Sequence, residues 1–413
     1  MISTALSQNA KSAHIRKSLA RRIAFVVASA AILAIAACAS SSSAPSDPGS
    51  STGAGSSSSP SATAASIVAQ AQSALDPYYK IRVWPVPTTG PAAAAKKRIW
   101  IVSCGQQSPG CADGVADAET AAKAIGWSVS IYDGNFDTNN AYTTGIQQAI
   151  AAQANGVLLY GIPCDSVTQA VANAKRAHIV VLSTESCSGG YGLEYAPGYE
   201  GNPQFFYLSG QLAAWKVIEA TDGKANVLFY NIVAEEDSVS EWAGFQNVMS
   251  RCQTCTVKEE NVPLSQLSPA LSAQVQSDLQ ANPGVNTIAV PYASVYDIGI
   301  GAGLARVNRK IFVMSGQQST SLYTAIHNTS SNVTLATVTS TSPGQSSWAA
   351  IDAMNRAFNG SPMIPEGAFL GITDSTHNLP PSGQGFDGPG EQQFFTTSFP
   401  YQDTYEKIWK DNG

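Results

Sequence analysis

The chain has 413 residues, of which 13% are charged, and its formal net charge at pH 7 is −6. Five basic residues and no acidic residue stand before position 38, so the remainder carries 18 Lys and Arg against 29 Asp and Glu, a net charge of about −11. This acidic balance excludes the charge pattern of a nucleic-acid-binding protein. The length predicts two domains rather than one.

The N-terminal region has the layout of a secretory signal. The basic residues precede an apolar run, residues 23–37, that is shorter than the about 20 residues of a membrane span. The residues Ile35-Ala36-Ala37-Cys38 resemble the bacterial lipoprotein signal. The resemblance implies removal of residues 1–37, lipidation of Cys38 and an extracytoplasmic protein anchored to the cell membrane. An ordinary cleaved signal with an incidental cysteine is the alternative.

The segment 38–62 is rich in Ser, Gly and Pro. Such a composition cannot bury enough apolar surface to fold, so this segment is predicted to be a flexible tether between the anchor and the folded domains.

Six cysteines remain once Cys38 is set aside, and an even number is typical of an oxidising compartment. They lie in close pairs, which favours one of the 15 possible pairings. The three predicted disulfides are Cys104 with Cys111, Cys164 with Cys187, and Cys252 with Cys255. The C-x-x-C spacing of the last pair also fits a redox or zinc motif. Zinc usually needs four ligands, and no second C-x-x-C exists. No metal and no cofactor are therefore expected.

From residue 97 the chain alternates between strand-like and helix-like segments. Buried or alternating strands are predicted at 98–103, 127–134, 156–161 and 178–184, with helices at 112–126, 141–155 and 165–177 between them. The Gly- and Tyr-rich segment 188–203 interrupts the pattern. Strands that alternate with helices of 10 to 15 residues predict a parallel sheet in an α/β fold.

The same alternation resumes at residue 206. Helices are predicted at 206–220, 238–251, 268–282, 294–307 and 345–359, and strands at 226–232, 256–262, 285–290, 310–315 and 332–340. The Gly- and Pro-rich tail offers one further possible strand, 392–398. The pattern therefore predicts a second parallel sheet.

The stretch "QQAIAAQANGVLLYGIPCDSVTQAVANAKRAHIVVLSTES", residues 147–186, resembles the type I periplasmic-type binding proteins of ABC importers, in the ribose- and galactose-binding branch. The resemblance extends over residues 97–360. It implies two doubly wound α/β lobes joined by three crossovers, near Pro203, Thr341 and Ile372. Lobe one would comprise 97–203 and 342–371, and lobe two 204–341 and 372–413.

Ligands bind beyond the carboxyl ends of the strands in open parallel sheets, and in a two-lobed binder both sheets direct those ends at one cleft. At most one of Glu235, Glu236 and Asp237 is expected in that cleft, because charge runs are usually solvated. The residues that the strand ends would deliver to the ligand are Ser103, Gln106, Gln107, Tyr160, Glu185, Asp237, Glu241, Trp242, Tyr292, Gln317, Gln318 and Thr341.

These residues depart from the pattern of the sugar binders. The Asp-Arg pair usual after the fourth strand is replaced by Glu185 and a serine, and Glu241 stands near the place of a second usual arginine. No cationic residue of the mature chain is predicted at a strand end, which disfavours phosphate and carboxylate ligands. Carboxylates, amides and aromatic rings suit a neutral polyol or a cation. A neutral sugar is favoured over an amine on the resemblance.

The resemblance implies a monomeric solute-binding protein that closes on a small ligand, delivers it to an ABC permease and performs no chemistry. A sensor of the same fold that presents its ligand to a receptor is the first alternative. An exported glycoside-acting enzyme is the second, because carboxylate pairs such as Glu185 with Glu241 could serve as acid and base.

Overall fold

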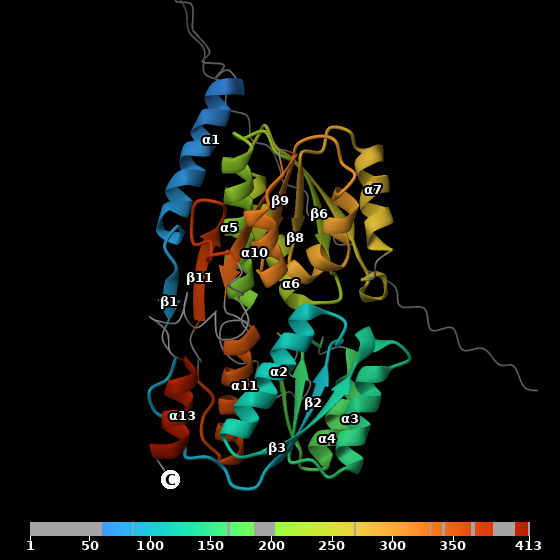
Figure 1. The fold of residues 1–413 in the computed structure, drawn as a ribbon, viewed down its shortest axis with the longest axis vertical. Helices are drawn as coiled ribbons and strands as arrows, with labels where there is room; N and C mark the ends of the chain where they lie inside the picture. Colours follow the sequence, from blue (N-terminus) through green and yellow to red (C-terminus); the bar gives the residue numbers. More distant parts are fainter. Residues whose placement is uncertain are drawn as a thin grey trace, which may run out of the picture. The chain divides into compact units, whose positions relative to one another are not determined.

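The computed structural model describes residues 60–84, 86–162, 166–185, 203–267, 270–330, 332–340, 343–364, 368–382 and 401–411. Cys38 and most of the predicted tether lie outside these ranges, although the tether's predicted end, residue 62, falls within the first described helix. Two sheets divide the described residues into a smaller and a larger lobe (Figure 1). None of the described helices has the length and apolar character needed to cross a membrane.

The smaller lobe is built on a four-stranded parallel sheet with the order β3-β2-β4-β5. Its strands are β2 (Arg98–Ser103), β3 (Ser128–Asp133), β4 (Gly156–Tyr160) and β5 (Val180–Ser183). Its helices are α2 (Pro109–Ala124), α3 (Ala141–Ala151), α4 (Thr168–Arg176) and α11 (Pro343–Phe358). α2 packs against α11 and α3 packs against α4, so one helix pair covers each face of the sheet.

The larger lobe contains a seven-stranded sheet with the order β1-β11-β10-β9-β8-β6-β7. Its strands are β1 (Arg82–Trp84), β6 (Asn226–Asn231), β7 (Thr256–Asn261), β8 (Thr287–Val290), β9 (Ile311–Ser315), β10 (Val333–Ser340) and β11 (Ala368–Thr373). The strands β10, β9, β8, β6 and β7 are parallel. β11 pairs antiparallel with β10, and β1 pairs antiparallel with β11 at the edge of the sheet. Two α/β lobes with parallel sheets confirm the predicted fold class.

Helices cover both faces of the larger sheet (Figure 1). They are α1 (Pro60–Leu75), α5 (Pro203–Ala220), α6 (Glu236–Met249), α7 (Leu271–Ala281), α8 (Ala293–Val295), a π-helical turn (Tyr296–Ile300), α9 (Gly301–Leu304) and α10 (Thr320–His327). Along β6, Val227 and Phe229 pack in one apolar cluster and Leu228 and Tyr230 in the other, because successive side chains of a strand point to opposite faces. Burial on both faces explains why the central strands β6, β8 and β9 are largely apolar, whereas the edge strand β7 is polar and partly exposed.

The lobe boundaries differ from the predicted ones at both ends of the chain. The segment from α1 to β1 precedes residue 97, yet α1 packs on α5 and β1 pairs with β11 in the larger sheet. β11 itself lies in the larger lobe, whereas 342–371 was expected in lobe one. The helix α13 (Tyr401–Asp411), expected in lobe two, packs against α11 of the smaller lobe. The predicted strand at 392–398 lies outside the described residues.

A buried polar network holds α13 on α11. The carboxylate of Asp352 is fully buried and accepts from Arg356 Nε at 2.7 Å and from the indole Nε1 of Trp409 at 2.8 Å. The rings of Trp348 and Trp409 stack with their centroids 5.6 Å apart. Because each oxygen of the buried carboxylate has a donor, the network ties the C-terminal helix to the lobe.

Trp409→Phe is expected to lower the free energy of unfolding by about 1–3 kcal/mol, since it removes a donor from a buried carboxylate. Urea denaturation monitored by circular dichroism measures this change. Trp100→Phe is the matched control, because the buried Nε1 of Trp100 has no hydrogen-bond partner among the described residues. An equal loss in the two variants would contradict the role given to the hydrogen bond.

Candidate functional site

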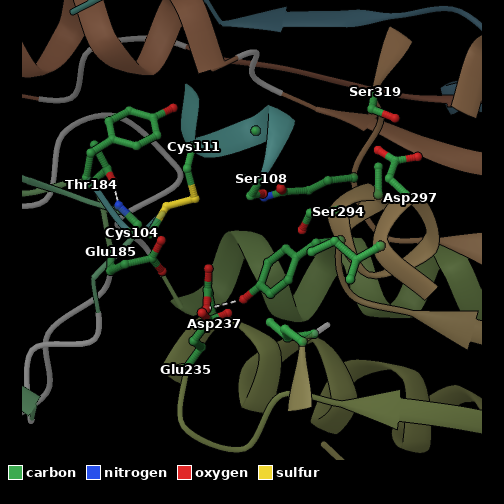
Figure 2. Close-up of a pocket in the computed structure, with 18 of the residues that line it drawn as sticks. Cys104, Ser108, Cys111, Thr184, Glu185, Glu235, Asp237, Ser294, Asp297 and Ser319 are labelled. Carbon is green, nitrogen blue, oxygen red and sulfur yellow. Dashed lines mark hydrogen bonds between the residues drawn. A yellow bond between two sulfur atoms is a disulfide. The ribbon is translucent and has the colours of Figure 1, made fainter. Parts of the chain in front are cut away.

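A cavity of about 130 Å³ lies between the two lobes, at the carboxyl ends of the parallel strands of both sheets (Figure 2). This volume is enough for on the order of ten water molecules, or for one small ligand. The smaller lobe contributes Cys104, Ser108, Gly110, Cys111, Phe136, Tyr142, Tyr160, Gly161, Thr184 and Glu185. The larger lobe contributes Phe206, Glu235, Asp237, Leu267, Tyr292, Ala293, Ser294, Asp297, Ile298, Gln317, Gln318 and Ser319.

One wall of the cavity is acidic. Figure 2 shows Glu185 from the smaller lobe on the same side as Glu235 and Asp237, which lie at the start of α6. Asp237 is only 3% exposed, and its Oδ1 accepts hydrogen bonds from the Tyr292 hydroxyl and, at 2.8 Å, from the backbone nitrogen of Ser238. The N-terminus of α6 further favours negative charge at this position. Both lobes therefore present carboxylates to one region.

The carboxylates of this wall influence one another. Burial, and then the charge of Asp237, raise the pKa of Glu235 to about 8, although a hydrogen bond with Tyr292 works against them. Burial raises the pKa of Tyr292 well above its usual value, and the charges of Asp237, Glu235 and Glu185 add to the effect. The cavity consequently has a negative potential that favours a proton on Glu235 near neutral pH.

Glu235→Gln is expected to stabilise the protein at pH 8 but not at pH 4. The raised pKa means that the native state keeps a proton that the unfolded chain releases above about pH 4.5. The stability linked to that proton is fully present below pH 4.5 and is lost as pH rises toward 8. Glutamine does not titrate, so the variant should exceed the wild type by on the order of 2 kcal/mol at pH 8.

Urea denaturation from pH 4 to 8 tests this expectation. Glu119→Gln is the control, because Glu119 lies on the surface in an ion pair with Lys123 and should change stability by less than about 1 kcal/mol. A difference between Glu235→Gln and the wild type that does not vary with pH would refute the assignment.

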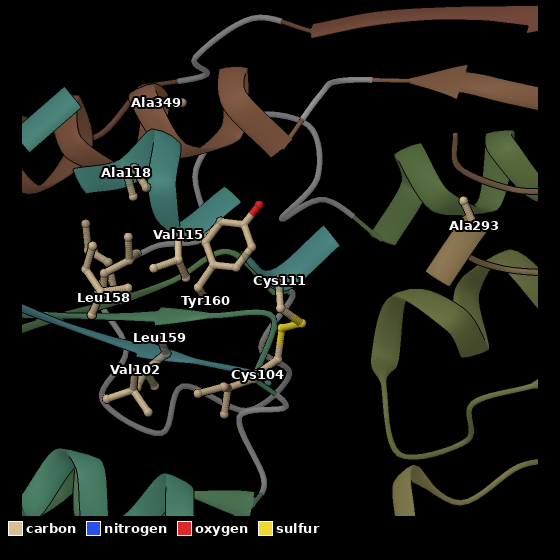
Figure 3. Close-up of a cluster of buried hydrophobic side chains, with 14 of the residues drawn as sticks. Val102, Cys104, Cys111, Val115, Ala118, Leu158, Leu159, Tyr160, Ala293 and Ala349 are labelled. Carbon is tan, nitrogen blue, oxygen red and sulfur yellow. A yellow bond between two sulfur atoms is a disulfide. The ribbon is translucent and has the colours of Figure 1, made fainter. Parts of the chain in front are cut away.

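The opposite wall is anchored in the apolar core of the smaller lobe. Figure 3 shows Tyr160 beside Val115 of α2, near the Cys104–Cys111 disulfide. A Cβ atom on Gly114 would lie 1.8 Å from the Tyr160 hydroxyl oxygen, so only glycine lets this ring pass over α2. Gly161 has φ +60°, and its nitrogen donates to Thr184 Oγ1 at 2.9 Å. These constraints fix the ends of β4 and β5 at the cavity.

The structure contains two of the three predicted disulfides, Cys104–Cys111 and Cys252–Cys255. The first bond closes the loop between β2 and α2, and both of its cysteines line the cavity. The predicted Cys164–Cys187 pair lies outside the described residues. The cavity wall on the side of α2 is thus covalently constrained, which reduces the ordering cost of binding.

Half of the predicted ligand residues line the cavity: Tyr160, Glu185, Asp237, Tyr292, Gln317 and Gln318. Glu235 also lines it beside Asp237, so the expectation of at most one acidic residue from this run is wrong. The side chain of Gln318 is buried and exchanges hydrogen bonds with the backbone of Ser340. Its amide therefore holds the loop after β9 onto β10.

Five predicted residues do not line the cavity. Ser103 is buried beneath it and accepts from the side chain of Gln106, while Gln106 and Gln107 themselves are exposed. Glu241 is fully buried behind Gly316, and Trp242 packs against Phe229. These residues follow strands in sequence, but the loops and the helix turn them away from the cavity. Thr341 lies outside the described residues.

Sequence reasoning missed several lining residues, most of them on turns or helices. Phe136 and Tyr142 come from the turn after β3 and from the start of α3. Phe136 has φ 50° between two further residues of positive φ, a backbone that is uncommon without glycine and clusters at functional sites. An apolar ring within "GNFDTNN" is the sequence signal that could have identified it.

Asp297 is a second missed residue and lies in the π-helical turn of the larger lobe. Figure 2 shows it with Ser294 and Ser319 on the far side of the cavity from Glu185. Its Oδ1 accepts from Ser321 Oγ at 2.5 Å. Burial raises the pKa of this carboxyl, against the effect of the serine hydrogen bonds. The π turn, which sequence periodicity does not reveal, is a recurrent feature of functional sites.

No family model and no curated protein matches this sequence. Solved structures do match its fold. An ABC transporter solute-binding protein from Agrobacterium vitis, bound with alpha-D-tagatopyranose, has a TM-score of 0.58 at 16% identity over 69% of this chain and 97% of that chain. A solute-binding protein from Mycobacterium smegmatis, with bound glycerol, has a TM-score of 0.57 at 20% identity over 68% and 95%.

A chain of the XylFII–LytSN complex matches with a TM-score of 0.56 at 16% identity, over 69% of this chain and 100% of that chain. At these identities the likeness concerns the fold alone. The chain has the two-lobed α/β fold of the type I periplasmic binding proteins.

Proposed function

We propose that the protein is a solute-binding protein that takes a small ligand of the sugar or polyol class between its two lobes. The observation that carries the proposal is the cavity itself, which lies at the strand ends of both lobes and is lined by carboxylates, hydroxyls and aromatic rings. Polyol hydroxyls donate to carboxylates, and the faces of sugar rings pack on aromatic side chains. The polyol and sugar bound by the two similar solute-binding proteins support the same class.

We further propose that the protein is extracytoplasmic, is anchored by lipid at Cys38 and delivers its ligand to an ABC permease. The signal-like N-terminus and the low-complexity segment that follows support the anchor. The fold supports delivery, since the two similar solute-binding proteins belong to ABC transporters.

Presentation of the ligand to a receptor is the second candidate, favoured by the likeness to a chain of the XylFII–LytSN complex. A binding assay separates the two roles. The protein is tested, with and without ligand, against the purified permease and against candidate receptors of the same cell.

The proposed function involves no reaction. Glu185 and Glu241 are the carboxylate pair that could serve a glycosidase. Only Glu185 lines the cavity, because Glu241 lies fully buried behind Gly316. A carboxylate outside the cavity cannot protonate or attack a bound sugar. Incubation with oligosaccharides should therefore release no product.

Thermal unfolding against sugars, polyols, amines, sugar phosphates and amino acids tests the proposed class. A ligand at 100 times its Kd adds about 2.7 kcal/mol to stability, a shift of a few degrees. Asp237→Asn should weaken binding by about 10- to 100-fold, whereas Glu119→Gln, on the surface of α2 outside the cavity, should not. Shifts with sugar phosphates or amino acids alone would contradict the proposal.

A further inference from the structure

The lining of the cavity is one-sided in charge. Four acidic residues line it, two at the start of α6, one after β5 and one on the π-helical turn: Glu235, Asp237, Glu185 and Asp297. The described lining contains no lysine or arginine. The sugar-like ligand of the proposed function would explain one or two acceptors, but it would not explain a uniform excess of negative charge.

Two of these carboxylates have no cationic partner among the described residues. The Oδ2 atom of Asp297 is buried and finds no hydrogen-bond partner among the described residues. Asp237 is nearly fully buried, and the donors to it are a tyrosine hydroxyl and a backbone nitrogen, both neutral. Buried carboxylates are ordinarily paired with a cation, and the described residues supply none to these two.

Aromatic rings surround the same space. Phe136, Tyr142 and Tyr160 come from the smaller lobe, and Phe206 and Tyr292 from the larger. Burial, followed by the charges of Glu235, Asp137, Glu185 and Asp133, raises the pKa of Tyr142. All four of these charges are negative, so the carboxylates and the electron-rich ring faces both attract a cation. Aromatic faces with nearby carboxylates are the usual environment of a bound ammonium group.

We propose that the ligand carries a positive charge on a polyhydroxylated frame, as in an amino sugar or an amine-bearing polyol, and that Glu185, Glu235 and Asp237 receive its ammonium group. This inference rests on the proposed function and narrows its ligand class. The three N–H donors of an ammonium group match three carboxylates, two from one lobe and one from the other. The ligand would thereby hold the two lobes together by charge.

The proton on Glu235 adds a second consequence. In the protein without ligand, repulsion from Asp237 and burial favour this proton near neutral pH. An ammonium group beside Glu235 reverses the sign of its surroundings and expels the proton. Binding of a cationic ligand at pH 7 should release up to about one proton, whereas a neutral sugar should release almost none.

Calorimetric titration with matched probes at pH 7 tests the inference. The pairs are D-glucose with D-glucosamine, D-galactose with D-galactosamine, and sorbitol with N-methyl-D-glucamine, and choline serves as an amine without the polyol frame. At least one amino member should bind at least tenfold more tightly than its hydroxyl counterpart. Titration in buffers of different ionisation enthalpy counts the protons released.

Variants separate charge from shape. Glu235→Gln and Asp237→Asn should each reduce the affinity for the amino member by tenfold or more and for the hydroxyl member by less. Glu235→Gln should also abolish proton release, which a merely structural role would not change. Glu119→Gln, on the surface of α2 and outside the cavity, should leave affinity and proton release as in the wild type.

Equal or tighter binding of the hydroxyl members would overturn the inference and leave the proposed function intact. Binding of choline alone would overturn both, since the polyol frame would then be irrelevant. Failure of every amino member to bind would overturn the inference, and the sugars and polyols of the thermal panel would then decide the proposed function separately.

Discussion

Lys216→Met should lower the free energy of unfolding by about 3–5 kcal/mol, because it leaves buried carboxylates without their cation. Lys216 Nζ lies 2.7 Å from Asp374 Oδ2, 2.8 Å from Glu219 Oε2 and 3.0 Å from the Tyr79 hydroxyl. The side chains of Lys216 and Asp374 are only 10% and 11% exposed. One ammonium group thus joins α5, the turn after β11 and the segment that leads into β1.

The pKa values show why this pair matters. Burial works against the charge on Lys216, but its hydrogen bonds to Asp374, Glu219 and Tyr79 raise its pKa above the usual value. Burial likewise works against the charge on Asp374, yet Lys216 lowers the pKa of this carboxyl well below its usual range. The depressed pKa means that this stability is present above about pH 4 and is lost as pH falls. The cost of Lys216→Met should shrink at acid pH.

Lys410→Met is the matched control for this prediction. Lys410 also forms an ion pair, with Glu406, but its side chain is 66% exposed. A surface pair is screened by solvent, so this variant should lose less than about 1 kcal/mol. Urea denaturation of both variants at pH 7 and at about pH 2, below the usual pKa of an aspartate, makes the comparison. Similar losses in the two variants at pH 7 would show that burial of the first pair has no special effect.

Gly316→Ala should cost about 3 kcal/mol or more, at the upper end of overpacking effects. A Cβ atom on Gly316 would lie 1.7 Å from Oε1 of Glu241, whose side chain is fully buried. The backbone of Gly316 is held on both sides, since its nitrogen donates to the Val290 carbonyl at 2.8 Å and its carbonyl accepts from Ser209 Oγ at 3.1 Å. The backbone is therefore fixed, and the Glu241 side chain would have to shift within the buried interior to admit a methyl group.

A double-mutant cycle identifies the carboxylate as the obstacle. Glu241→Ala frees the space that the new methyl group needs, so in that background Gly316→Ala should cost less than about 1 kcal/mol. The coupling between the two sites should then be about 2 kcal/mol or more. Gly110→Ala is the control, because a Cβ atom there meets no atom within 4 Å. Additive losses in the cycle would rule out the clash.

The regular part of the fold could be predicted from the sequence. Each of the nine predicted strands between 98 and 340 forms. The central ones contain apolar runs such as "GVLLY" that are buried on both faces and bounded by turn residues. The segments that escaped prediction are short or lie near the chain ends. β1 has three residues, and β11 follows a Gly- and Pro-rich stretch. Their pairing depends on the partner strand rather than on a local pattern.

The site could be predicted only where a strand end sets the direction of a side chain. Tyr160 ends β4 and Tyr292 follows β8, and both line the cavity as expected. Glu241 lies one helical turn beyond Asp237, and this step along α6 places its carboxylate against Gly316 rather than in the cavity. Asp297 and Phe136 lie on a π turn and on a turn of positive φ, and neither conformation has a periodic signature.

The exchange of chain ends between the lobes has a consequence for synthesis. The four strands of the smaller lobe are complete by Ser183, yet the helix pair on one face of their sheet needs α11, which ends at Phe358. The helix that packs over α11 ends at Asp411. During translation the four strands of this sheet are therefore synthesised long before α11 and α13, which cover one of its faces. Such long-range closure slows folding and leaves an apolar face of the sheet uncovered until late in synthesis.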